Sequence, residues 1–176
     1  MPSLIDIRRR IRSVKNTQQI TKAMKMVSAA KLRRAQDRVI AARPYAALLR
    51  QVLTDVAAAA AAAEPAGENP LLAERAERRI LLVLITGDKG LAGAFNTNLI
   101  KGAQRFFAER GGASVTLELI GRKGRDFFRK RGAAISGEHI GLAAKVVYTE
   151  TAAIARKAIE MFRNGEIGRA SCRERV

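Results

Sequence analysis

The sequence predicts an α/β protein in which a long basic N-terminal helix is followed by an incomplete parallel, Rossmann-like domain. Three observations predict this fold. Residues 3–58 keep a helical spacing of apolar side chains, residues 80–86 form a continuous apolar run, and residues 80–165 alternate strand-like and helix-like segments. Such alternation is typical of a parallel sheet covered by helices. We therefore divide the chain into a helix (1–63), a linker and lead-in (64–79), a partial α/β domain (80–165) and a terminal segment (166–176).

The N-terminal helix is predicted to begin at Ser3, a good N-cap residue, with Asp6 in its first turn. Apolar residues then recur at alternating spacings of three and four, which is typical of a coiled coil. A helix of this length would extend for about 80 Å, so we expect it to project from the domain and to need a partner helix. Pro44 predicts a kink or a local break. The expected seam residues are Ile7, Ile11, Val14, Leu32, Val39, Leu49 and Leu53.

The middle of this helix has a different pattern. Seam positions 18, 21, 25 and 28 are polar, and the apolar residues shift sideways to Ile20, Met24 and Val27. The middle part is therefore expected to face a different environment from the two ends.

The positive charge of the chain is concentrated in the N-terminal helix. The net charge is +17, and residues 1–50 hold thirteen Lys or Arg but only two acids, Asp6 and Asp37. This balance implies an anionic partner: nucleic acid, a membrane surface or an acidic protein surface. The first 44 residues contain no aromatic side chain to stack on bases, which weakens the nucleic-acid alternative without removing it. The sequence contains no apolar run of about 18 residues, so it predicts no membrane-spanning helix.

The second part of the chain is predicted to alternate strands and helices. It holds two or three strands, so the sheet looks unfinished. The expected strands are Ile80–Thr86, Val115–Gly121 and, less regular, Ala133–Ile140, and the expected helices are Asn96–Arg110, Arg122–Arg131 and Thr149–Arg163.

Residues 87–93 (GDKGLAG) join the first strand to a helix, where backbone amides can bind phosphate. The spacing matches neither the Walker A pattern nor the dinucleotide fingerprint, so a tight turn is favoured. His139 is the only histidine and Cys172 the only cysteine. We expect no catalytic, cofactor-binding or metal-binding residues.

Three stretches carry a resemblance to a known family. They are SVKNTQQITKAMKMVSAAKLRRAQ (Ser13–Gln36), TGDKGLAGAFN (Thr86–Asn96) and GRKGRDFF (Gly121–Phe128). All three resemble the γ subunits of F-type ATP synthases, in order, over residues 1 to about 165. The first stretch is highly specific, and the other two support it by their position.

The resemblance implies a rotor subunit of the proton-transporting ATP synthase, which couples rotation to ATP synthesis or hydrolysis without catalytic residues of its own. The long helix would pair with a second helix inside a ring of α and β subunits. The α/β domain would contact the ε subunit and the membrane c-ring. The chain would be held at the cytoplasmic face of the bacterial inner membrane only through the complex. It would bind no cofactor and no nucleic acid. The shaft residues expected to face partners are Gln18, Lys22, Met24, Lys25, Lys31 and Arg34.

Residues 166–176 (EIGRASCRERV) show no periodicity where a further strand is expected. They resemble the translation of a sequencing-library adapter. We therefore interpret the segment as a non-native tail on a truncated reading frame, which lacks the remaining strands and the second shaft helix.

Overall fold

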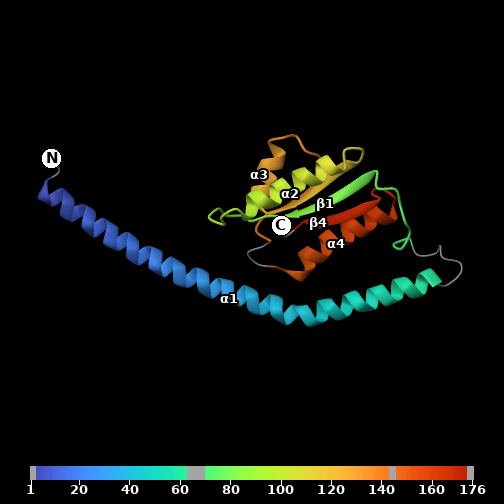
Figure 1. Ribbon diagram of the computed structural model, residues 1–176, viewed down its shortest axis with the longest axis horizontal. Coiled ribbons are helices and arrows are strands. Elements are labelled where there is room, and N and C mark those ends of the chain that lie inside the picture. The colour runs from blue at the N-terminus through green and yellow to red at the C-terminus, as the bar shows by residue number, and fades with distance from the viewer. Residues whose placement is uncertain (1–2, 63–69, 143–145, 174–176) are drawn as a thin grey trace. The chain divides into compact units, whose positions relative to one another are not determined.

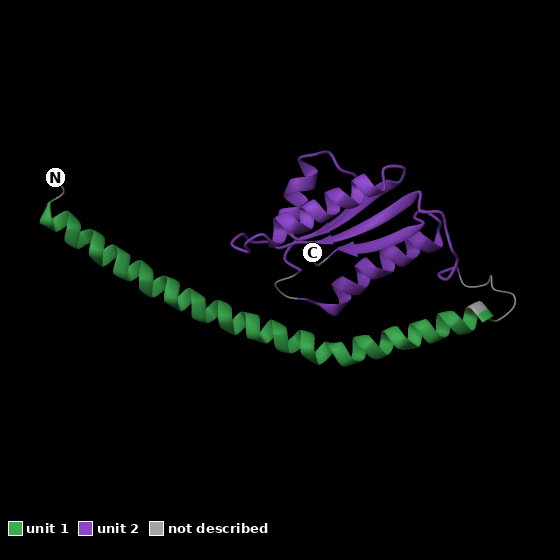
Figure 2. Ribbon diagram, in the orientation of Figure 1, with its two compact units in different colours: residues 1–66 green, residues 67–176 purple. Residues whose placement is uncertain are grey.

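The structure, a computed structural model, describes residues 3–62, 70–142 and 146–173. It divides into two compact units, Met1–Ala66 and Gly67–Val176, which Figure 2 shows in different colours. The division falls inside the linker predicted for residues 64–79. Most of the proline- and glycine-rich part of that linker lies outside the described residues.

The first unit is one helix, α1 (Leu4–Ala62). Its start confirms the predicted cap: the Ser3 amide donates to Asp6 Oδ2 at 3.2 Å, and the Asp6 amide donates to Ser3 Oγ at 3.4 Å. Pro44 lies inside the helix, which curves but runs on as one ribbon (Figure 1), so the alternative of a local break is wrong. Proline removes only one backbone donor, and the helix-favouring alanine and leucine turns beside it keep the helix continuous.

The second unit is built on a four-stranded parallel sheet of order β3-β2-β1-β4. Its strands are β1 (Arg79–Ile85), β2 (Ser114–Ile120), β3 (Ile135–His139) and β4 (Arg169–Arg173). The prediction of two or three strands is therefore wrong, because it omitted the edge strand β4. This strand lies inside the terminal segment and pairs with β1. The side chains of β4 are mostly exposed, so the strand has no apolar pattern that the sequence alone would reveal. The proposed origin of that segment stays a prediction.

Helices cover both faces of this sheet. Figure 1 shows α2 (Phe95–Glu109) and α3 (Arg122–Arg129) on one face and α4 (Tyr148–Arg163) on the other. The larger core joins β1 and β2 to α2 and α3 through side chains such as Leu82, Leu99 and Phe128. A smaller core joins Ile120 to Ile154 of α4. The predicted α/β fold is confirmed, and apolar side chains pack on both faces of β1 and β2.

The carboxyl ends of β1 and β2 meet at a very close contact. Thr86 donates its amide to the Ile120 carbonyl at 2.7 Å, and its Oγ1 accepts the Gly124 amide at 2.9 Å. Gly121 has a φ of +99°, and a Cβ there would lie 2.0 Å from the Thr86 carbonyl oxygen. Only glycine fits this turn, which places the start of α3 against the end of β1.

We expect Gly121→Ala to destabilise the α/β domain strongly, and Gly132→Ala to serve as its matched control. Gly132 also has a positive φ, +65°, but nothing lies within 4 Å of its Cβ position. Both substitutions cost backbone strain of about 1–2 kcal/mol, whereas only the first adds a steric clash of about 1–3 kcal/mol more. Urea titration followed by hydrogen exchange of the β1 and β2 amides measures both. Equal losses would contradict the close approach to Thr86.

Candidate functional site

The candidate functional site is the surface of α1. Each of the seven predicted seam residues is exposed, from 43% for Ile7 and Leu49 to 67% for Val14. An aliphatic side chain of this size contributes about 1.5–3 kcal/mol when it is fully buried. Within its own unit, α1 therefore exposes the apolar side chains whose burial normally stabilises a helix.

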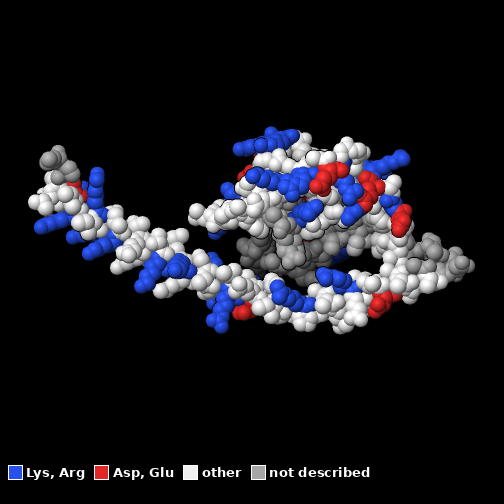
Figure 3. Space-filling view, in the orientation of Figure 1, with Lys and Arg blue, Asp and Glu red and all other residues white. Residues whose placement is uncertain are grey.

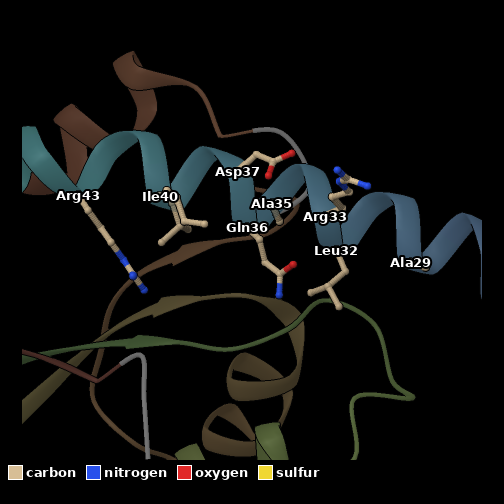
Figure 4. A pocket seen from close by; sticks show the side chains of 9 residues that line it. Ala29, Leu32, Arg33, Ala35, Gln36, Asp37, Ile40 and Arg43 are labelled. Carbon is tan, nitrogen blue, oxygen red and sulfur yellow. The ribbon is translucent and has the colours of Figure 1, made fainter.

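A close view of the middle of α1 shows how its faces differ (Figure 4). The side chains of Leu32, Gln36 and Ile40 point to one side of the helix, whereas Arg33 and Asp37 point away from it. All the described residues that line this pocket belong to α1, between Ala29 and Arg43. One helix cannot enclose a ligand, so this is a strip of helix surface suited to another helix or a protein surface.

The six predicted partner-facing residues do not form one patch. All six lie on α1 and are exposed. At about 100° per residue, Gln18, Lys22 and Lys25 lie on one side of the helix. Met24, Lys31 and Arg34 lie on the nearly opposite side by the same geometry. No single neighbour can contact all six, so the middle of α1 suits contact from two sides. Whether partners contact these residues stays a prediction.

The basic residues of α1 are spread from Arg8 to Arg50, and the rest of the helix holds none. Figure 3 shows Lys and Arg side chains distributed over the helix with few acidic ones among them. A helix with this surface repels itself and attracts anionic surfaces, mainly over the short range that salt allows.

The glycine loop of the α/β domain uses its polar groups internally. The Gly87 amide donates to Asn96 Oδ1 at 2.8 Å, and the Gly87 carbonyl accepts the Lys123 amide at 3.1 Å. The Asp88 carboxylate accepts the amides of Arg122 and Gly141, at 3.0 and 3.1 Å. This carboxylate occupies the edge where a phosphate would bind, which supports the tight-turn interpretation of residues 87–93.

Sequence reasoning missed an ionic cluster around one buried carboxylate, between the sheet and α4. Glu118 of β2 is 1% exposed and accepts hydrogen bonds from His139 Nε2 at 2.7 Å and Lys157 Nζ at 2.8 Å. Lys157 also donates to the Ser136 carbonyl at 2.8 Å. Gly137 leaves room for the carboxylate, since a Cβ there would lie 2.2 Å from Glu118 Oε1. The one available signal was an acidic residue inside the otherwise uncharged strand VTLELI.

This cluster keeps Glu118 ionised. Burial raises the pKa of its carboxyl group, but the hydrogen bonds from Lys157 and His139 outweigh burial and leave the pKa below its usual value. His139, the only histidine of the sequence, thus joins β3 to β2, whereas Lys157 joins α4 to both strands. The cluster is fully paired and packed, which fits a structural role.

A second ionic cluster lies at the other end of the sheet. Glu77, just before β1, pairs with Arg110 after α2 and with Arg169 of β4. The hydrogen bond from Arg169 is the largest cause that lowers the pKa of Glu77. The cluster ties β4 and α2 to the start of β1.

Within residues 3–62, 70–142 and 146–173, no group of three or more His, Cys, Asp or Glu residues is placed to hold a metal ion. None of the helices in those ranges is long and apolar enough to cross a membrane.

Comparison with known proteins identifies the family. The family model described as ATP synthase matches residues 3–172, so the chain belongs to this family. The chain is 79% identical over 167 residues to the ATP synthase gamma chain of Solibacter usitatus (strain Ellin6076). It is 53% identical over 169 residues to that of Anaeromyxobacter sp. (strain Fw109-5). These alignments cover 95% of this chain and 58% of each relative. The chain thus spans less than two thirds of the length of these relatives.

We expect Glu118→Gln to cost about 1–2 kcal/mol of domain stability at neutral pH, because Lys157 loses a charged acceptor. The lowered pKa of Glu118 means that its ionised form stabilises the fold above the unfolded pKa of about 4.3, and that this contribution is lost as the pH falls through the folded value. The difference between the two proteins should therefore shrink in acid. Urea titrations between pH 7 and pH 3 measure it.

Glu138→Gln is the matched control for that experiment. Glu138 on β3 pairs at 3.2 Å with Arg129, whose side chain is 66% exposed, and such surface pairs contribute about 0–1 kcal/mol. A difference between wild type and Glu118→Gln that stays constant down to pH 3 would contradict the ionised cluster.

Proposed function

We propose that the chain is the central-stalk, or rotor, subunit of an F-type proton-transporting ATP synthase, and that α1 forms part of its rotating shaft. The rotor couples proton-driven rotation to ATP synthesis or hydrolysis in the β subunits and has no catalytic residues of its own. The observation that carries this proposal is the exposed apolar seam along a 59-residue helix, in a chain that matches the ATP synthase family over residues 3–172.

The arrangement of α1 supports a shaft. Its two end sections present an apolar seam for a second helix, which we place antiparallel to α1. Its middle section presents polar and basic residues on two opposite sides, and we assign these to the surrounding α and β subunits. Weak, solvent-exposed ion pairs of roughly 0–1 kcal/mol each suit a surface that must pass several identical partners in turn.

We assign the α/β domain to the base of the stalk, against the ε subunit and the membrane c-ring. Its paired ionic clusters and two cores make it a rigid attachment for the shaft. The complex would hold the chain as a peripheral subunit at the cytoplasmic face of the bacterial inner membrane. The family match favours this function over nucleic-acid binding, the alternative that the charge of α1 leaves open.

We expect the double substitution Lys25→Glu and Lys31→Glu to alter ATP turnover or coupling by severalfold, because it reverses charges on the proposed shaft surface. The substitutions are made in a gamma chain of full family length that carries these residues, and the chain is purified with its α and β subunits and reconstituted with the membrane sector. ATP hydrolysis and proton pumping are then measured together.

Arg9→Glu with Arg12→Glu is the control, since it makes the same change in charge near the end of α1. Unchanged hydrolysis and pumping in the Lys25/Lys31 variant would contradict the shaft-surface role. Failure of the unsubstituted chain to co-purify with α and β subunits would contradict the proposed function itself.

A further inference from the structure

Four basic residues form a row beside the seam of α1. Arg8, Lys15, Arg43 and Arg50 each directly follow a seam position, after Ile7, Val14, Ala42 and Leu49. Their numbers differ by multiples of seven, so in a coiled coil all four lie along the same flank of the seam. We call this row the basic flank. It borders both apolar end sections, and Lys22 continues the same row into the polar middle.

The basic flank has no acidic neighbours on its own helix. The positions three and four residues before and after each of its members hold apolar residues, glutamine, threonine or arginine, and never an acid. Among the described residues, none of the four takes part in an ion pair. The acids near the start and middle of α1 lie elsewhere: Asp6 is three residues before Arg9, and Asp37 is four residues after Arg33, on the side away from the seam.

The opposite flank of the seam is different in the second end section. The flanking positions there are Lys31, Arg38, Tyr45 and Val52, of which only the first two are basic. Beyond residue 38, the charge beside the seam is therefore carried by the basic flank alone. Flanking charges in coiled coils select the partner, because unlike charges attract across the seam and like charges repel.

We infer that α1 pairs with a helix whose own apolar seam is flanked by acidic residues that face Arg8, Lys15, Arg43 and Arg50. The inference rests on the proposed pairing of α1 along its seam and adds the chemistry that selects the partner. Charge complementarity and the exposed seam together favour this partner, because a phosphate backbone offers no apolar surface and a membrane surface suits a broad apolar face rather than a narrow seam.

Two synthetic helical peptides of identical composition test this inference. Both have a leucine seam. One has glutamate at the positions that flank the seam and glutamine on the outer face, and the other exchanges these two sets. Binding to the whole chain is measured by fluorescence anisotropy at low and high salt. The peptide with acidic flanks should bind about tenfold more tightly at low salt, and this preference should weaken at high salt.

Two variants of the chain locate the effect. Arg8→Glu with Lys15→Glu reverses half of the basic flank and should abolish the preference. Arg9→Glu with Arg12→Glu makes the same change in charge away from the seam and should keep the preference. Equal binding of both peptides to the unsubstituted chain, or equal loss of preference in both variants, would overturn the acidic-flank inference while helix pairing stands. If neither peptide binds, the proposed pairing itself fails.

Discussion

One constraint governs the first unit: a 59-residue helix exposes its apolar side chains in two end sections. Most helices in proteins are stabilised by packing of an apolar face, and propensity alone contributes little. The apolar residues of α1 are spaced for a narrow coiled-coil seam. We therefore propose that the helix depends on a second helix, and that the basic flank and the polar middle section limit what that helix and the other neighbours can be.

The α/β unit follows the opposite principle, because its own residues satisfy most of its needs. Apolar strands β1 and β2 lie between helices, and the buried Glu118 is paired with His139 and Lys157. Glu77 likewise joins β1, α2 and β4. Among the described residues, the basic side chains of α1 take part in no such ion pairs. The two units therefore differ in how much each depends on neighbours.

The sequence predicted most of this fold, and its omissions have physical causes. The long helix, its cap at Ser3, strands β1 and β2 and the helices on both faces follow from periodicity and from runs of apolar residues. Strand β4 was missed because an exposed edge strand is held by its backbone, which leaves no side-chain pattern. The Glu118 cluster was missed because His139 and Lys157 lie 21 and 39 residues after Glu118 in the sequence, and only the topology brings β2, β3 and α4 together. The seam residues followed from the spacing of apolar residues along the helix, but this spacing does not identify the partner that covers them.

The central claim is that α1 is a shaft helix whose seam is covered only when it assembles with a partner. Hydrogen exchange of the α1 amides, measured in the isolated chain and in a gamma chain of full family length assembled with α and β subunits, tests this claim most directly. Exchange in α1 should be fast in the isolated chain and slowed by orders of magnitude in the complex, while the β1 and β2 amides stay protected in both. Equal protection of α1 in the two states, or fast exchange of α1 in the complex, would contradict the account.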